Sequence, residues 1–301
     1  MYTNTVRLQV NAKINLSLNV AGKAHNGYHC LDMVMASVNL FDTVTVARRA
    51  DKIVTVAMAD ARGVPIDVKP ELNTAYKAAS MLSSGFGLSG CDISIVKGIP
   101  LAGGLGGSSA DAAGAIYALS KLHNIDVKSS GAYLIAFRSG SDVPYMLDGG
   151  YAHVYGRGEK INMIACRHKF HLVIAKGKAG CSTWEAYAAF DKLGKTRGSG
   201  TAQILRALTE TDPLKSGAAG AAPYLQNDLQ EASISLCPEI AATLELLQST
   251  APLCALMSGS GSACFAVYAS AEDSRRAYAQ IKDKTDFCAV CETVPRGITE
   301  V

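Results

Sequence analysis

The sequence is poor in charge and in tryptophan, and it has no long apolar run. Charged residues make up 18% of its 301 residues, there is one tryptophan, and the formal net charge is only +3. No basic cluster stands out, so the composition argues against a nucleic-acid-binding protein. No stretch of about 18 apolar residues occurs, which argues against a helix that spans a membrane. The first residues also lack the basic and then apolar order of a signal peptide, so we expect a cytoplasmic protein.

The nine cysteines are scattered along the chain and odd in number. In a protein of this size they indicate reduced, buried side chains in a reducing compartment. Cys288 and Cys291 have the spacing Cys-x-x-Cys, but a second pair or histidines at the ligand spacing of a zinc site do not follow. Because both lie in a strand-like run, the pattern favours core packing over a metal or redox role.

Hydrophobic residues make up 49% of the chain, and the length suggests two domains around sizeable cores. The order of the patterns predicts an α+β fold with antiparallel strands. We expect strands at 6–20, 32–38, 43–48, 53–58, 92–97, 151–156, 171–176, 253–257, 263–268 and 286–293. We expect helices at 73–84, 109–122, 129–138, 184–192, 201–209, 226–248 and 272–282. Residues 194–222, rich in Gly, Ala, Ser and Lys, indicate a mobile connection, with a lid over a ligand as one possible role.

Apolar and polar residues alternate strictly from residue 6 to residue 20. Alternation with period two predicts a half-buried strand, or two strands in line. It places Lys13 and Asn15 together on the open face, where two polar groups could line a ligand site. Periodicity alone, however, favours a solvated face.

A glycine-rich segment, 100–114, follows a predicted strand and opens into a predicted helix. Its glycines let the backbone approach a ligand closely, and the N–H groups of a helix start attract an anion such as phosphate. Ser108, Ser109 and Asp111 suit the cap and first turn of that helix. The segment is neither a Walker A motif nor a dinucleotide fingerprint. We favour phosphate binding over an ordinary flexible turn.

Two more glycine-rich segments follow, at 140–150 and 257–262. In the first, Asp142 lies within Gly-Ser-Asp-Val-Pro, a rigid setting for a carboxylate, and it is equally readable as the polar residue of a turn. The second lies between two apolar strand-like runs. It indicates either a tight turn or a backbone surface that closes over a ligand.

In order, spacing and content, these three segments resemble the motifs of the GHMP kinases across nearly the whole chain. Further motifs are similar to those of the members that phosphorylate cytidine diphosphate-linked methylerythritol in the non-mevalonate isoprenoid pathway. These motifs are Lys13-Ile-Asn-Leu-Ser-Leu-Asn-Val-x-Gly22, Gly27-Tyr-His-x-Leu31, Gly140-Ser-Asp-Val-Pro144 followed by Gly149-Gly150, Gly156-Arg-Gly-Glu159, Asn227-Asp-Leu229 and Cys237-Pro-Glu-Ile240. The chain differs at 23–26, where it has Lys-Ala-His-Asn and the family usually carries an arginine and an aspartate, and its glycine run is shifted.

The resemblance implies a two-domain kinase that uses ATP and Mg²⁺. It implies an N-terminal domain like ribosomal protein S5 domain 2 over residues 1–160, with the phosphate loop, and a ferredoxin-like C-terminal domain over 161–301. The acceptor would be a small molecule, and the chain a monomer or a homodimer. Two alternatives stay open. One is a GHMP kinase for another alcohol, such as homoserine or mevalonate, and the other is a non-catalytic relative that binds nucleotide.

The resemblance also implies roles at the phosphate end. Asp142 would act as general base for the acceptor hydroxyl or orient it, and Lys13 would keep Asp142 ionised and stabilise charge near the transferred phosphate. Asn15 would contact the acceptor. No protein ligand for Mg²⁺ is implied firmly, but Ser108 or Ser109 would be placed to help hold it. The residues that would cradle the triphosphate are Pro100, Gly103, Gly104, Leu105, Gly106, Gly107, Ser108 and Ser109.

At the acceptor end, Tyr28 and His29 resemble the pair that recognises the cytosine. Thr183 would lie near Asp142, and Tyr187 would stack on the other side of the base. The two are four residues apart, so on a helix they share one face. Their alternative roles are a helix cap for Thr183 and a core aromatic for Tyr187.

Overall fold

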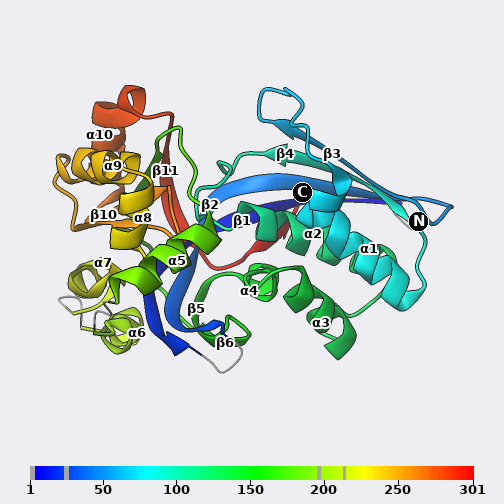
Figure 1. Cartoon of the computed structure of the whole chain (residues 1–301), viewed down its shortest axis with the longest axis horizontal. Coiled ribbons are helices and arrows are strands. Elements are labelled where there is room, and N and C mark those ends of the chain that lie inside the picture. Colours follow the sequence, from blue (N-terminus) through cyan, green and yellow to red (C-terminus); the bar gives the residue numbers. More distant parts are fainter. Residues whose placement is uncertain (1–3, 24–26, 195–197, 213–214) are drawn as a thin grey trace.

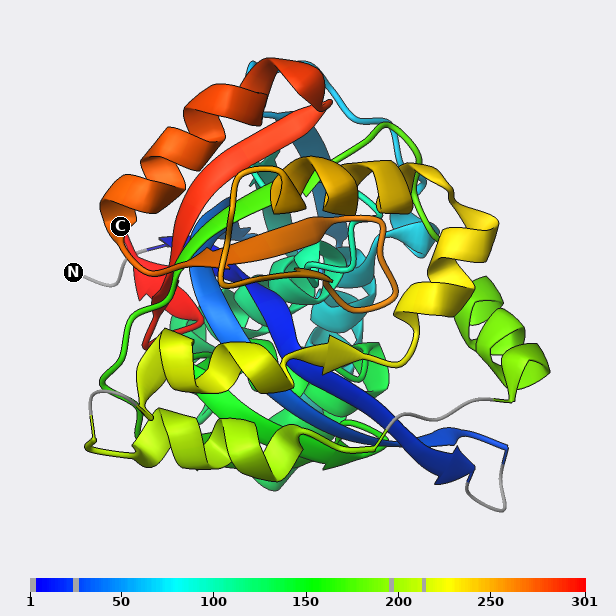
Figure 2. The same cartoon turned by 90° about the vertical axis from the view of Figure 1, so that its left-hand side faces the viewer.

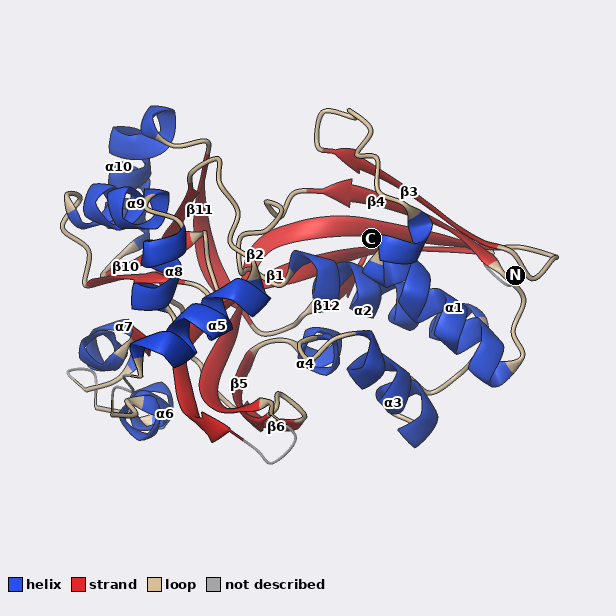
Figure 3. Cartoon of the chain, viewed as in Figure 1, coloured by secondary structure: helices blue, strands red, loops and turns tan. Residues whose placement is uncertain are grey.

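In the computed structural model, which describes residues 4–23, 27–194, 198–212 and 215–301, two sheets meet end to end (Figures 1 and 3). The first is built on β1 (Thr5–Lys23) and β2 (His29–Arg48), which pair along their whole length. Its other strands are β3 (Val54–Asp60), β4 (Cys91–Lys97), β5 (Tyr151–Gly156), β6 (Lys160–Ile164), β8 (Gln226–Asn227) and β12 (Ile298–Glu300). The strands of both sheets pair antiparallel except for β3 with β4 and β1 with β8, which pair in parallel.

The second sheet has the strand order β11-β7-β10-β9. Its strands are β7 (His171–Lys176), β9 (Cys254–Met257), β10 (Cys264–Tyr268) and β11 (Phe287–Val294). The end of β11 also pairs with β2, through Thr293 opposite Val38, so the two sheets are joined. In Figure 2 the far end of the β1–β2 hairpin extends beyond the second sheet.

Helices pack on both sheets and at their junction (Figure 1). Those of the first half are α1 (Thr74–Phe86), α2 (Gly107–Leu122), α3 (Ser130–Ser139) and α4 (Val143–Asp148). Those of the second half are α5 (Thr183–Leu193), α6 (Thr201–Thr209), α7 (Gly217–Ala221), α8 (Gln230–Leu236), α9 (Glu239–Gln248) and α10 (Ala271–Ile281). Within the described part of the chain, no helix is long and apolar enough to cross a membrane.

Helix α2 positions the glycine-rich segment because it packs very closely on the first sheet. Its buried face consists largely of small residues, and a Cβ atom at Gly114 would come within 2.8 Å of Val10 and 3.0 Å of Val44. The N-terminus of α2 is therefore held against β1, beside Lys13.

The α+β prediction is confirmed, and most predicted elements are present within a few residues. The single helix predicted at 226–248 is wrong: β8, α8 and α9 share that range, and the break falls at Pro238, which lacks an N–H donor and restricts the preceding residue. The ranges 32–38 and 43–48 form one strand, β2. The boundary near residue 160 stays a prediction, and β12 returns to pair with β1.

From Lys13 to Asn19 the odd-numbered face of β1 is buried and not solvated, whereas Arg7 near the start of the strand is exposed. Lys13, Asn15, Ser17 and Asn19 are each at most 4% exposed. Part of the cover comes from α6, where Thr201 hydrogen-bonds to Ser17 and Asn19. The prediction of a half-buried strand is wrong for this stretch. Alternation within one strand does not show which other elements of the chain pack on its polar face.

The described part of the stretch 194–222 contains α6 and α7, and α6 buries Ile204 and Leu208. Residues 195–197 and 213–214 lie outside the described residues. A role for this stretch as a lid stays a prediction.

Candidate active site

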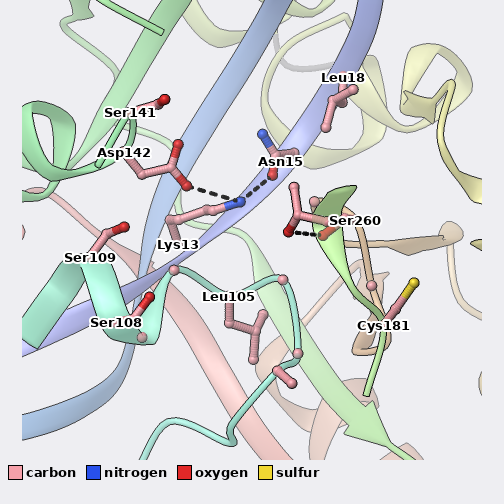
Figure 4. A pocket seen from close by; sticks show the side chains of 18 of the residues that line it. Lys13, Asn15, Leu18, Leu105, Ser108, Ser109, Ser141, Asp142, Cys181 and Ser260 are labelled. Carbon is pink, nitrogen blue, oxygen red and sulfur yellow. Dashed lines mark hydrogen bonds and ion pairs between the residues drawn. The ribbon is translucent and has the colours of Figure 1, made fainter. Parts of the chain in front are cut away.

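The three glycine-rich segments meet at one cavity of about 400 Å³ between the two sheets (Figure 4). It is bordered by β1, the loop before α2, the start of α4, the start of α5 and the turn between β9 and β10. The cavity brings together predicted site residues from distant parts of the chain: Lys13, Asn15, Pro100, Gly103, Gly104, Leu105, Gly106, Gly107, Ser108, Ser109, Asp142, Thr183 and Tyr187.

Lys13 lies at the centre of the cavity, between Asp142 and Asn15 (Figure 4). Its Nζ is 3.7 Å from Oδ2 of Asp142 and donates a hydrogen bond of 2.6 Å to Oδ1 of Asn15. The Lys13 side chain is 6% exposed, and Asp142 is 29% exposed. Burial lowers the pKa of Lys13, and the neighbouring Asp142 carboxylate only partly offsets this. The pair can hold and move a proton beside a bound ligand.

The loop before α2 presents free N–H groups to the cavity. The N-cap of α2 is Gly106, with φ +75°, and no side chain caps the helix. Of the prediction that Ser108, Ser109 and Asp111 suit the cap and first turn, the cap is wrong, because the helix begins earlier, and the first turn is confirmed for the two serines. The uncapped N–H groups and the dipole of a long helix suit an anion such as phosphate.

The third glycine-rich segment braces this loop from behind. A Cβ atom at Gly104 would lie 2.2 Å from the Ser258 carbonyl oxygen, and Ala263 N–H donates to the Gly103 carbonyl at 3.1 Å. Asn227 Nδ2 donates to the carbonyl oxygens of Met257 and Gly259, which fixes the turn itself. The turn is thus a backbone surface against the loop, as well as part of the cavity wall.

A buried ion cluster lies behind the loop, and no sequence pattern predicts it. Lys97 Nζ contacts Asp42 Oδ2 and donates to Asp111 Oδ2 at 2.7 Å, while Asp42 Oδ1 accepts from the N–H groups of Gly98 and Ile99. Burial raises the pKa of Asp111 to about 7, since one lysine cannot fully compensate two carboxylates. The cluster ties β2, β4 and α2 together beneath the cavity.

The predicted base-recognition residues form two stacked pairs at one side of the cavity. The rings of His29 and Tyr187 are stacked with 4.7 Å between centroids, and the Arg157 guanidinium lies 3.9 Å from the centre of the Tyr28 ring. Tyr187 and Arg157 line the cavity, whereas Tyr28 and His29 contact them without lining it. Of the altered segment 23–26, only Lys23 is described.

Thr183 reaches the cavity from the first turn of α5. Its hydroxyl is 2.8 Å from the Ser260 hydroxyl on the opposite wall. The N-cap of α5 is Ser182, whose side chain accepts from the N–H of Glu185. The alternative in which Thr183 caps the helix is therefore wrong. Tyr187 is half-buried, and burial raises the pKa of its hydroxyl.

Arg157 is the main cavity residue that sequence reasoning missed, although it stands in the quoted Gly-Arg-Gly-Glu motif. Three cations line the cavity: Lys13, Lys97 and Arg157. The first two face carboxylates, whereas Arg157 has no carboxylate partner within the described residues, and its Nε is buried without a hydrogen bond. The Gly-Arg-Gly-Glu motif could have drawn attention to Arg157, but a motif does not show which groups surround the arginine.

The chain matches two family descriptions, GHMP kinases N terminal domain over residues 73–151 and GHMP kinases C terminal over residues 204–285. It is 39% identical to a 4-diphosphocytidyl-2-C-methyl-D-erythritol kinase of Cutibacterium acnes, covering 86% of this chain and 84% of that one. It is 37% identical to a kinase of the same name from Desulfitobacterium hafniense, over 99% of both chains.

Solved structures give the same relationship. A 4-(cytidine 5'-diphospho)-2C-methyl-D-erythritol kinase superposes with a TM-score of 0.77 and 27% identity, over 95% of this chain and 98% of that one. A homoserine kinase from Cytophaga hutchinsonii has a TM-score of 0.74, over 100% of this chain and 98% of that one. Because it is only 17% identical, it shows the fold alone.

Proposed function

This chain belongs to the family of GHMP kinases, and we propose that it transfers a phosphoryl group from ATP to the 2-hydroxyl group of 4-diphosphocytidyl-2-C-methyl-D-erythritol. The product would feed the non-mevalonate route to isoprenoid precursors. The observation that carries the proposal is the Lys13–Asp142 pair, 3.7 Å apart, in the same cavity as the uncapped start of α2. The choice of acceptor is supported by the relatives of that name, which match over most of their length.

Phosphoryl transfer needs alignment and charge stabilisation more than covalent chemistry from the protein. Asp142 would accept the proton of the acceptor hydroxyl or orient that group for attack. Lys13 would balance the charge of Asp142 and that of the transferred phosphoryl group, while Asn15 holds the Lys13 ammonium in place. The glycine-rich loop would bind the triphosphate through backbone N–H groups.

Mg²⁺ fits this site as an ion bound mainly by phosphate oxygens. The described residues contain no cluster of three His, Cys, Asp or Glu side chains that would hold a metal by themselves. Mg²⁺ usually takes one or two protein groups and otherwise phosphate and water oxygens. The Ser108 or Ser109 hydroxyl and the Asp142 carboxylate are the groups at hand. When bound, the ion would neutralise charge on the phosphates.

Arg157 suits the diphosphate of the acceptor. A diphosphate needs a cation, and Lys13 and Lys97 already face carboxylates. A guanidinium binds phosphate oxygens through several N–H groups at once. Because Arg157 lies against the Tyr28 ring, it would also place the diphosphate next to the cytosine end, between base and sugar alcohol.

The test is an ADP-release assay with ATP and Mg²⁺. The acceptors are 4-diphosphocytidyl-2-C-methyl-D-erythritol, homoserine, mevalonate and galactose. We expect turnover with the first alone and its loss in Asp142→Asn. Isothermal titration calorimetry with ATP then shows whether the inactive variant still binds the nucleotide. Turnover with another acceptor would overturn the choice of substrate, and normal turnover in Asp142→Asn would overturn the role of Asp142.

A further inference from the structure

The turn between β5 and β6 holds Arg157 at the edge of the cavity. It contains Gly156 and Gly158, with φ of +75° and +103°, a region of backbone conformation that favours glycine. The carboxylate of Glu159 folds back over the turn, and its Oε2 accepts a hydrogen bond of 2.5 Å from the Arg157 N–H. A Cβ atom at Gly156 would lie 2.5 Å from Glu159 Oε1, so glycine at this position leaves room for the carboxylate. The turn is therefore built around the Glu159 side chain.

Glu159 binds the backbone of Arg157 and leaves its guanidinium to the cavity. Arg49 and Asp51 have the same order and spacing in the chain, and their side chains form an ion pair of 2.7 Å. Arg157, in contrast, has no carboxylate partner within the described residues, and its Nε is buried without a hydrogen bond. A buried polar group without a partner is costly unless a ligand supplies one. The contact that Glu159 makes thus keeps the charge of Arg157 available to a ligand.

Two further contacts fix the turn relative to the predicted base. The Tyr133 hydroxyl on α3 donates a hydrogen bond of 3.2 Å to the carbonyl oxygen of Glu159. On the other side, a Cβ atom at Gly158 would lie 3.3 Å from Cβ of Ser141 and 3.4 Å from its carbonyl oxygen. Ser141 precedes Asp142, and both line the cavity (Figure 4). The turn therefore packs directly against the segment that carries Asp142.

We propose that Glu159 is a positioning residue for the acceptor: by binding the Arg157 N–H it fixes the turn, so that the guanidinium meets the acceptor diphosphate at a set distance from Asp142. Glu159 does not itself line the cavity, so it acts through Arg157. Phosphoryl transfer depends on such alignment of the bound groups. The inference rests on the proposed function, since it takes the ligand of Arg157 to be the diphosphate of the acceptor.

The kinetic test compares Glu159→Ala with Glu159→Gln. The alanine variant loses a hydrogen bond to a charged group, so KM for the acceptor should rise about tenfold. Both kcat and KM for ATP should change less than about threefold, because Asp142 and the phosphate loop are untouched. The glutamine variant keeps an acceptor oxygen for the Arg157 N–H and should retain most of the affinity. A glutamine variant as impaired as the alanine variant would contradict the proposal.

A double variant shows whether Glu159 acts through Arg157. Arg157→Met removes the guanidinium, so the position of the turn should no longer matter for the diphosphate. Adding Glu159→Ala to Arg157→Met should therefore raise KM for the acceptor by less than about twofold. A further tenfold rise would show that Glu159 acts independently of Arg157, and the proposal would be wrong.

Glu210→Ala is the matched control. Glu210 is half-buried, as is Glu159, and its carboxylate also accepts backbone N–H groups, from Thr211 at 2.8 Å and Asp212 at 3.3 Å. It does not line the cavity. The control should keep KM for the acceptor, and thermal unfolding of both variants measures the stability that each one loses. An equal rise in KM in both would assign the effect to general loosening and overturn the proposal.

The diphosphate contact can also be measured without turnover, by calorimetry with cytidine and with cytidine diphosphate as probes. The gain in affinity from the first to the second measures the contribution of the diphosphate. We expect this gain to be about tenfold smaller in Glu159→Ala than in the wild type. The same gain in both proteins, or no gain in the wild type, would overturn the proposal. Failure of the proposed function would show separately, as a wild type that does not phosphorylate the cytidine-linked acceptor.

Discussion

The Lys13 ammonium has two partners and little water, which sets how the site responds to pH. Burial lowers the pKa of Lys13, so it loses its charge at a lower pH than the ordinary lysine value of 10.5. As pH rises through that lowered pKa, the charge beside the transferred phosphoryl group disappears. We expect kcat to fall on the alkaline side, starting below pH 10.5.

Lys13→Arg separates this cause from others, because a guanidinium stays protonated throughout the range. The variant should have a lower kcat at pH 8, because the planar guanidinium group does not reproduce the geometry of the Lys13 ammonium group. Its kcat should nevertheless show no alkaline fall. A pH–kcat profile measures both. The same alkaline fall in the variant would assign the titration to another group.

Arg157 gives a second prediction at the scale of one side chain. If it binds the acceptor diphosphate, Arg157→Met removes a charge-assisted contact worth about 1.5–3 kcal/mol, so KM for the acceptor should rise roughly 10- to 100-fold. KM for ATP should stay within about threefold, because the phosphate loop is untouched. Arg206→Met, an exposed arginine on α6 that does not line the cavity, is the control. A rise confined to KM for ATP would place Arg157 on the nucleotide.

At the scale of elements, the Asp42–Lys97–Asp111 cluster joins β2, β4 and α2. Its contribution to the free energy of unfolding depends on pH. The pKa of Asp111 is raised to about 7 in the folded protein, from 3.8. Between these values the unfolded chain loses a proton that the folded protein keeps. The free energy of unfolding should therefore decrease from about pH 4 to about pH 7 through this residue.

Asp111→Asn should remove most of that decrease, because an amide does not titrate while its oxygen still accepts from Lys97. Denaturant unfolding of both proteins between pH 4 and pH 8 measures the difference. Asp148→Asn is a suitable control, since Asp148 is more exposed and pairs with Lys128 at the surface. An equally steep pH dependence in Asp111→Asn would show that the cluster does not share a proton in this way.

At the scale of the whole molecule, the sequence predicts the local motifs of the site. It does not predict the contacts that distant parts of the chain make with them. Lys13, Asp142 and the glycine-rich loop stand in local patterns, and the fold brings them to one cavity. Asp191 contacts His29 although the two are 162 positions apart, and no local pattern encodes such a contact. Likewise, the burial of Asn15 depends on elements from the rest of the chain that cover β1.

ATP binding should also depend on both halves of the molecule. The glycine-rich loop before α2, from the first half, packs against the turn between β9 and β10, from the second half. Gly104 has φ +72°, and its Cβ position lies 2.2 Å from the Ser258 carbonyl oxygen, so Gly104→Ala must push the two halves apart there. We expect KM for ATP to rise at least about tenfold and the stabilisation by ATP in thermal unfolding to be lost. Gly63→Ala supplies the control for backbone strain, because Gly63 has φ +82° but no atom within 4 Å of its Cβ position. If both variants lost ATP binding equally, general destabilisation and not the contact between the halves would be the cause. A loss confined to Gly104→Ala would show that ATP binding requires the close contact between this loop and the turn at Ser258.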